Sequence, residues 1–214
     1  MYDPYNFHLG SALTICPGKN FQVMPGNPNL SACPNSAKEI KLINDMRLKW
    51  SQHVYWTRML LLSIAHRLSD LDAVTARLMQ NPKDIANIFA EYYPPDVART
   101  ITALLTEHLQ IGADLITALR DGKRAQASTL NHAWYVNADK MAEAFSSISP
   151  YYDQKAMREM LYTHLNLTTQ EVAMRLAGNF SADIQAFDAV EAEALTMADA
   201  FTAGIRMQFP QMFC

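Results

Sequence analysis

Four long stretches of this chain carry apolar residues at the three- and four-residue spacing of an amphipathic helix. They cover about 37–68, 95–120, 123–148 and 181–209. No stretch shows the two-residue period of a strand bounded by hairpin turns, and the seven glycines are few for a β-sandwich. We therefore predict an all-α fold, a four-helix bundle with short connecting helices, whose longer connections allow a ferritin-like layout.

Sequence signals also place the ends of the main segments. Ser36 and Glu39 are spaced as a capping box that opens the first long helix. Residues 1–36 are rich in proline and glycine and poor in charge, so we expect a non-helical N-terminal arm. The bundle then covers 37–210, and a C-terminal tail covers 211–214. Because the arm contains apolar side chains, we expect it to pack on its own bundle or on a neighbouring subunit.

Four shorter helices fill the connections between the long ones. They are expected at about 72–80, 84–92, 153–166 and 168–177. Thr168 and Glu171 are spaced as a second capping box, which predicts that the last of these helices begins at Thr168.

Charge and hydropathy argue against two classes of partner. The net charge of −3 and the sequence pI near 6.0 provide no basic face for nucleic acid. The longest apolar run, from Met59 to Ala65, is too short to span a bilayer. The first residues lack the positive segment and the apolar core of a secretory signal. We therefore expect the protein in the cytoplasm, or at a cell or spore surface reached by another route.

The three cysteines lie near the ends of the chain. Cys16 and Cys33 fall in the predicted arm and Cys214 is the last residue, so none lies in the helical body. Their spacing matches no zinc ribbon, redox pair or haem attachment motif. Two interpretations stay open: incidental thiols in a reducing cytosol, or disulfides that link neighbouring subunits.

Each long helix carries polar residues near its middle, on or beside its apolar stripe. These are His53 on the first helix, Glu107 and His108 on the second, Asn137 on the third, and Asp188 and Glu191 on the fourth. His164 faces inward on one of the shorter helices. Because helices of similar length packed side by side place their midpoints at a similar depth, we expect these side chains to converge inside the bundle.

A metal site is one interpretation of this polar layer. Imidazole and carboxylate groups that converge in a dry cavity bind iron, manganese or zinc. The candidate ligands are His53, Glu107, His164 and Glu191, with Arg58, His108, Asn137, Asp139 and Asp188 as supporting residues. However, the Glu-x-x-His pairs of ferritin-like di-iron proteins do not occur in the sequence.

Two other interpretations of the polar layer stay open. The same residues can form a buried hydrogen-bond network that fixes helix register without any ligand. They can also line a pocket for an organic molecule. The sequence contains no Gly-x-Gly-x-x-Gly, Walker or Gly-x-Ser-x-Gly motif. We therefore predict no catalytic residue and favour a protein that is not an enzyme.

Five short motifs are distributed over the predicted bundle. They are Trp50-x-x-His53-x-x-Trp56-Thr57-Arg58, Leu105-Thr-Glu-His-Leu109, Trp134-Tyr-x-Asn-Ala-Asp139, Met160-Leu-Tyr-x-His164-Leu-x-Leu-Thr168 and Gln208-Phe-Pro210. With these residues, the chain resembles a family of small helical proteins from spore-forming Firmicutes, over about residues 40–210. Members of that family are often labelled acetylglutamate kinase. Such a kinase needs a three-layer α/β fold and glycine-rich phosphate loops, and this sequence predicts neither, so the label is not carried over.

The favoured functional prediction is a non-enzymatic subunit that self-assembles into a homo-oligomer or polymer. The arm and Cys16, Cys33 and Cys214 would link neighbouring copies in a surface- or spore-associated assembly. The alternative is a metal-binding four-helix bundle with a buried His/Glu site, in one version an oxidoreductase. The cofactor in that alternative is a transition metal ion.

Overall fold

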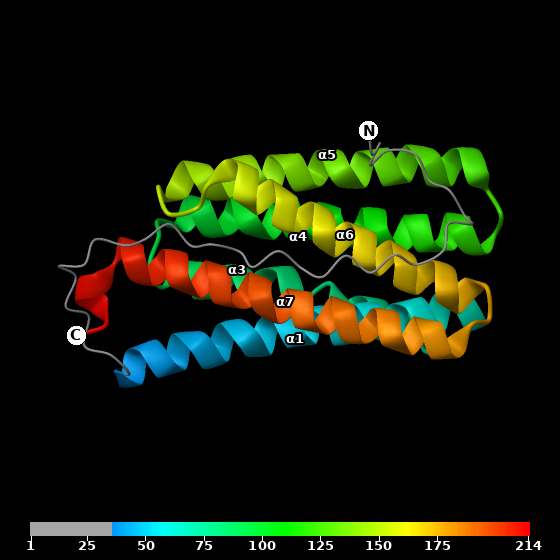
Figure 1. The fold of residues 1–214 in the computed structure, drawn as a ribbon, viewed down its shortest axis with the longest axis horizontal. Coiled ribbons are helices and arrows are strands. Elements are labelled where there is room, and N and C mark those ends of the chain that lie inside the picture. Colours follow the sequence, from blue (N-terminus) through cyan, green and yellow to red (C-terminus); the bar gives the residue numbers. More distant parts are fainter. Residues whose placement is uncertain (1–35) are drawn as a thin grey trace.

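A computed structural model describes residues 36–214 of the chain (Figure 1). This part of the chain contains helices and no strand, which confirms the all-α prediction. The elements are α1 (Ala37–His66), α2 (Leu71–Leu78), α3 (Asn81–Ala90), α4 (Pro95–Arg120), α5 (Arg124–Ile148), α6 (Gln154–Leu176), α7 (Phe180–Gln208) and the 3-10 turn η1 (Pro210–Met212). Of the predicted N-terminal arm, all but Ser36 lies outside the described residues.

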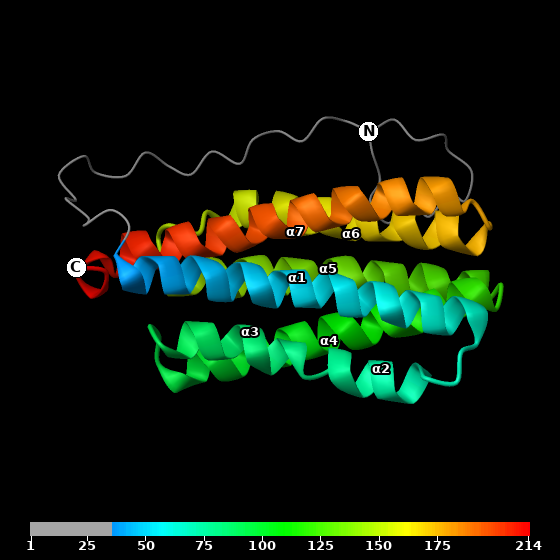
Figure 2. The same ribbon diagram turned by 90° about the horizontal axis from the view of Figure 1, so that it is seen from below.

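The described helices pack as three antiparallel hairpins. α2 and α3 return along α1, α5 returns along α4, and α7 returns along α6. α1, α4 and α6 therefore run in one direction, as the colour sequence in Figures 1 and 2 shows. The first and last hairpins also pack against each other, because α1 lies beside α7. This arrangement is a helical bundle, as predicted.

One long helix replaces two of the predicted short ones. α6 continues through Thr168, where the sequence predicts the start of a new helix. The Thr168 hydroxyl donates to the carbonyl oxygen of His164 at 2.9 Å, so it bonds within the helix instead of capping another. The part of the chain that the structure describes thus has five long helices. None of its helices has the length and apolar character needed to cross a membrane.

The helix ends follow their local sequence signals. At the start of α1, the Ser36 side chain accepts a hydrogen bond from the backbone N–H of Glu39 at 3.2 Å. Gly122 and Gly178 follow the ends of α4 and α6 with φ angles of 69° and 74°, which glycine adopts without steric cost.

Aromatic rings fill the core at the end of the bundle where α1 begins and α7 finishes. Trp50 stacks on Phe201 with ring centroids 5.4 Å apart. The phenol of Tyr152 reaches the same place and donates to the carbonyl oxygen of Phe201 at 2.7 Å. Gly204 makes this approach feasible, because a Cβ at that position would lie 2.0 Å from Cε1 of Tyr152.

The predicted C-terminal tail packs on this aromatic core. Phe213 is buried and stacks on Tyr92 with ring centroids 5.7 Å apart. Tyr92 also stacks on Phe209, at the end of α7. The residues after α7 are therefore part of the folded bundle up to Phe213, and Cys214 is exposed beyond it.

Candidate metal centre

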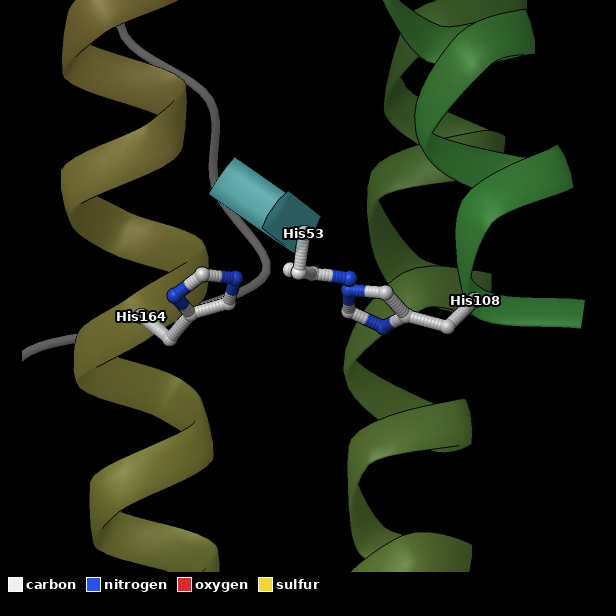
Figure 3. A group of neighbouring side chains, drawn as sticks. All are labelled: His53, His108 and His164. Carbon is white, nitrogen blue, oxygen red and sulfur yellow. The ribbon is translucent and has the colours of Figure 1, made fainter. Parts of the chain in front are cut away.

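Three buried histidines face one another inside the bundle (Figure 3). His53 comes from α1, His108 from α4 and His164 from α6, the three helices that run in one direction. One ring nitrogen from each histidine lies within 4.8 Å of the others. The exposed fractions of the three residues are only 2%, 3% and 4%. We refer to these three residues as the histidine cluster.

Asn81 fixes the orientation of His53. Nδ1 of His53 lies 2.8 Å from Oδ1 of Asn81, the first residue of α3. The Asn81 amide nitrogen donates to the carbonyl oxygen of Lys49 at 2.9 Å, so its oxygen must face the histidine. An amide oxygen can only accept, and therefore the proton sits on Nδ1 of His53. The lone pair of Nε2 is left to face the other two rings.

Glu193 holds His164 in the same way. Oε2 of Glu193, on α7, lies 3.1 Å from Nδ1 of His164. Because the carboxylate accepts the Nδ1 proton, Nε2 of His164 also points into the cluster, as Figure 3 shows. A carboxylate behind an imidazole fixes its tautomer and raises its basicity, and this pairing is frequent in metal sites.

His108 completes the cluster, and its ring is held less firmly than the rings of His53 and His164. In Figure 3 its Nε2 faces His53, whereas Nδ1 lies on the side of the ring nearer the α4 backbone and points away from His53. Nδ1 is buried without a hydrogen bond of normal geometry, and so is Oδ1 of Asn137. Asn137 on α5 is fully buried, and its amide nitrogen donates to the carbonyl oxygen of Leu104 at 3.1 Å. That bond leaves the amide oxygen as an acceptor for the Nδ1 proton of His108.

The arrangement is repeated three times along the chain. The histidines recur at intervals of 55 and 56 residues, one in the first helix of each hairpin. The supporting residue follows its histidine by 28 residues for Asn81 and by 29 for Glu193, always in the returning helix of the same hairpin. Asn137 also follows its histidine by 29 residues. This repetition supports the assignment of Asn137 as the partner of His108.

Burial keeps the rings of His53 and His108 uncharged. Burial, followed by repulsion from His164, lowers the pKa of His53 from 6.5 to about 4, against the opposing effect of the hydrogen bond with Asn81. Burial also lowers the pKa of His108 well below its ordinary value, and the neighbouring His53 and His164 add to that shift. Neutral imidazole is the form that binds metal ions.

A small cavity opens beside the histidine cluster. Its volume is about 20 Å³, enough for one water molecule. Thr57, Gly112 and Thr168 line it, and each follows one of the three histidines by four residues on the same helix. The other lining residues outside the cluster are apolar, among them Leu109 and Trp134. The cluster therefore has protein on most sides and a small open space on one.

Glu107, a predicted ligand, lies outside the cluster. Consecutive residues on a helix point about 100° apart, so Glu107 faces away when His108 faces in. Its carboxylate accepts from the amide nitrogen of Asn137 at 2.9 Å and pairs with Lys140 at 3.3 Å. The hydrogen bond from Asn137, supported by Lys140, lowers the pKa of Glu107. Glu107 thus acts on Asn137 rather than on a metal ion.

Glu191 is the second predicted ligand that lies elsewhere. Its carboxylate accepts from the hydroxyl of Tyr55 at 2.7 Å, at the surface between α1 and α7. The acidic residue that α7 directs to the cluster is Glu193, two positions further on, and it contacts His164 rather than the open space. Asp188 is exposed and takes no part in the cluster.

Arg58 belongs to a separate buried ion network. Its guanidinium donates to Glu171 at 2.5 Å and to both oxygens of Asp183 at 3.0 Å. Glu171 and Asp183 are buried, and Arg175 also pairs with Asp183. Burial raises the pKa of Glu171 to about 7, although Arg58 opposes the shift. The network therefore links α1 to α6 and α7, whereas the hydrogen-bond partners of His53 and His164 are Asn81 and Glu193.

The remaining predicted residues divide between the bundle and the ends of the chain. Asp139 accepts from the hydroxyl of Tyr162 at 3.0 Å and so links α5 to α6. Cys16 and Cys33 lie outside the described residues, whereas Cys214 is at the surface. Cys214 is the single cysteine within residues 36–214, so that part of the chain contains no disulfide.

Sequence reasoning missed two residues that define the site, Asn81 and Glu193. Asn81 precedes Pro82, and this pair reads as a break between short helices. Glu193 lies beside a more central acidic residue, Glu191, on the same helix. The signal that identifies both is the spacing, since a histidine recurs about every 55 residues with an amide or carboxylate residue about 28 positions after it.

The donor set of the cluster suits a transition metal ion. Imidazole nitrogen binds zinc, copper, iron and nickel, whereas calcium and magnesium prefer oxygen. Three nitrogens at about 2.0–2.1 Å from a tetrahedral ion lie about 3.4 Å apart. The three rings therefore need to approach one another by no more than about 1.4 Å from the observed 4.8 Å limit. No family model, curated protein or solved structure matches the chain.

Proposed function

We propose that this chain is a metal-binding helical bundle that holds one transition metal ion through Nε2 of His53, His108 and His164. The observation that carries the proposal is the convergence of three buried imidazole nitrogens, one from each hairpin, within 4.8 Å. The hydrogen bonds from Nδ1 of His53 and His164 support it, because they direct the Nε2 lone pairs to a common point.

Zinc is the ion that fits this set of ligands best. Sites with three histidines and one open position are a known form of catalytic zinc site, whereas structural zinc sites are closed by four protein ligands. The described residues place no carboxylate or thiolate in the cluster, which disfavours manganese and cuprous copper. Ferrous iron, nickel and cupric copper share the preference for imidazole and are the competing ions.

Elemental analysis of protein purified without added metal tests the proposal. We expect about one equivalent of metal in the wild type and less than a tenth of that in His53→Ala, His108→Ala and His164→Ala. His66→Ala is the matched control, because His66 lies at the exposed end of α1 and should leave the metal content unchanged. Circular dichroism verifies that each variant is helical.

An absence of metal would leave a different role for the cluster. If neither purified nor zinc-supplemented wild type holds a stoichiometric ion, the histidines form a buried hydrogen-bond network. In that network Asn81 and Glu193 hold Nδ1 of His53 and His164 by hydrogen bonds. The histidine variants would then lose stability without any change in metal content.

Self-association is a second candidate function, and it is supported by the exposed surface of α1 rather than by the histidine cluster. Large apolar side chains are exposed on α1 at helical spacing: Ile40, Leu48, Tyr55 and Met59. Exposed apolar side chains that share one helix face are typical of protein interaction sites. Light scattering of the full chain with and without reductant tests this function. An oligomer that dissociates in a Leu48→Lys/Met59→Lys variant would support it, whereas a monomer under both conditions would exclude it.

A further inference from the structure

We propose that the metal ion carries one exchangeable water molecule, placed in the cavity beside the cluster and hydrogen-bonded to Thr57 and Thr168. This inference rests on the proposed metal site and goes further, because it assigns the fourth coordination position and its ligand. The cavity adjoins all three histidines and has a volume of about 20 Å³. That volume admits one water molecule or a small anion and excludes larger ligands.

The open space follows from the residues one helical turn beyond the histidines. In α1, α4 and α6 the position four residues after the histidine points to the same side, because the three helices run in one direction. Those positions hold Thr57, Gly112 and Thr168, and all three line the cavity. Larger side chains in this layer would fill the space above the metal.

The two threonines are acceptors for a ligand that donates. The hydroxyl of Thr57 donates its proton to the carbonyl oxygen of His53 at 2.8 Å, and that of Thr168 donates to His164 at 2.9 Å. A hydroxyl has one proton and two lone pairs, so each oxygen can still accept a hydrogen bond. Water has two protons to donate, whereas an anion such as azide has none.

The walls of the cavity explain why the ligand is small and why it is held near the ion. Leu60, Leu78, Leu109 and Ile116 line the cavity together with the ring of Trp134. A buried water molecule needs two to four polar partners. The metal ion and the two threonine oxygens supply three, and the apolar walls supply none.

Cobalt(II) and azide together test the inference. Cobalt(II) is added to metal-free protein, and its visible absorption spectrum reports the coordination of the ion. In the wild type we expect one equivalent of cobalt and a saturable spectral change when azide replaces the water. Ala113 also lines the cavity, and Ala113→Val should abolish the azide response while the cobalt stoichiometry stays at one.

The threonine variants separate a bound water from an empty coordination position. Thr57→Val and Thr168→Val each remove an acceptor that stabilises water but not azide, so each should tighten azide binding about fivefold. Thr117→Val is the matched control, because Thr117 makes the same bond to the carbonyl oxygen four residues earlier but does not line the cavity. Its azide affinity should equal that of the wild type.

Three results would overturn the inference, and they differ in what else they exclude. Stoichiometric cobalt without any azide response in the wild type would reject the exchangeable water and leave the metal site in place. Equal azide affinities in the wild type and in both threonine variants would reject the role of the hydroxyls. A failure to bind cobalt would reject the proposed metal function itself.

Discussion

Oδ1 of Asn81 lies 2.8 Å from Nδ1 of His53, so the first residue of α3 determines which nitrogen of an α1 histidine faces the cluster. Asn81→Ala removes that acceptor and leaves the ring free to rotate or to change tautomer. We expect metal affinity to fall about 10- to 100-fold, the usual effect of losing a group that orients a ligand. Competition with a chromophoric chelator measures the metal affinity. Asn81→Asp keeps an acceptor and should retain more affinity than Asn81→Ala.

Glu193 should tune the affinity of the site through His164. Glu193→Gln keeps an oxygen acceptor but removes the negative charge, so we expect about a tenfold loss of metal affinity in the same competition assay. Glu191→Gln on the same helix is the control, because Glu191 contacts Tyr55 instead. Equal losses in the two variants would mean that the effect is general electrostatics rather than the hydrogen bond to His164.

The stability of the metal-free protein should depend on His53 between about pH 6.5 and 4. The folded pKa of about 4 lies below the ordinary 6.5, so the unfolded state binds more protons in this range. The free energy of unfolding therefore falls as the pH drops, by about 3 kcal/mol over the full range. Urea titrations of the wild type and of His53→Gln at several pH values measure this contribution as the difference in slope.

The wild type must be compared with His53→Gln because Glu171 changes the free energy of unfolding with pH in the opposite direction. Its pKa is raised to about 7 from 4.5 by burial, so its contribution to stability is present at low pH and is lost as the pH rises through 7. Glu171 is common to the wild type and His53→Gln, and its contribution cancels in the difference. A His53→Gln variant with the same pH slope as the wild type would contradict the assignment.

Arg58 should matter for stability and not for metal content. Arg58→Ala leaves the buried carboxylates of Glu171 and Asp183 short of a cation, which costs about 3–5 kcal/mol. Arg47→Ala breaks an exposed pair with Asp199 and should cost less than about 1 kcal/mol. Urea unfolding measures both, and elemental analysis should find the wild-type metal content in each. Metal loss in folded Arg58→Ala would place Arg58 in the site after all.

Helical periodicity was sufficient to predict the fold and the inward histidines. His53 and His164 lie on the buried stripes of α1 and α6, and the structure brings them together with His108. Periodicity does not identify the acidic residues of the site, because Glu107 and Glu191 are near the same depth as the histidines but on other faces of their helices. The distinction depends on helix rotation, which packing against neighbouring helices determines.

The continuity of α6 could not be predicted from local signals. Thr168 and Glu171 match the pattern of a capping box, and that pattern is short enough to occur inside a helix. In the folded chain the carbonyl oxygen of His164 accepts a hydrogen bond from the Thr168 hydroxyl, and Glu171 pairs with Arg58 from α1. The bond of Thr168 is made within the helix, whereas the pairing of Glu171 with Arg58 joins residues 113 positions apart. The partner of Glu171 thus depends on tertiary structure, which a local pattern does not contain.

The threefold recurrence of histidine and supporting residue has a consequence for folding. Each hairpin supplies one of the proposed ligands, and none of the three supplies two. Partly folded states with one hairpin detached would therefore bind the ion weakly, since they retain at most two ligands. A ligand that binds only the complete native state adds its binding free energy to the cooperativity of unfolding. Metal uptake would thus report when the last of the three hairpins has docked.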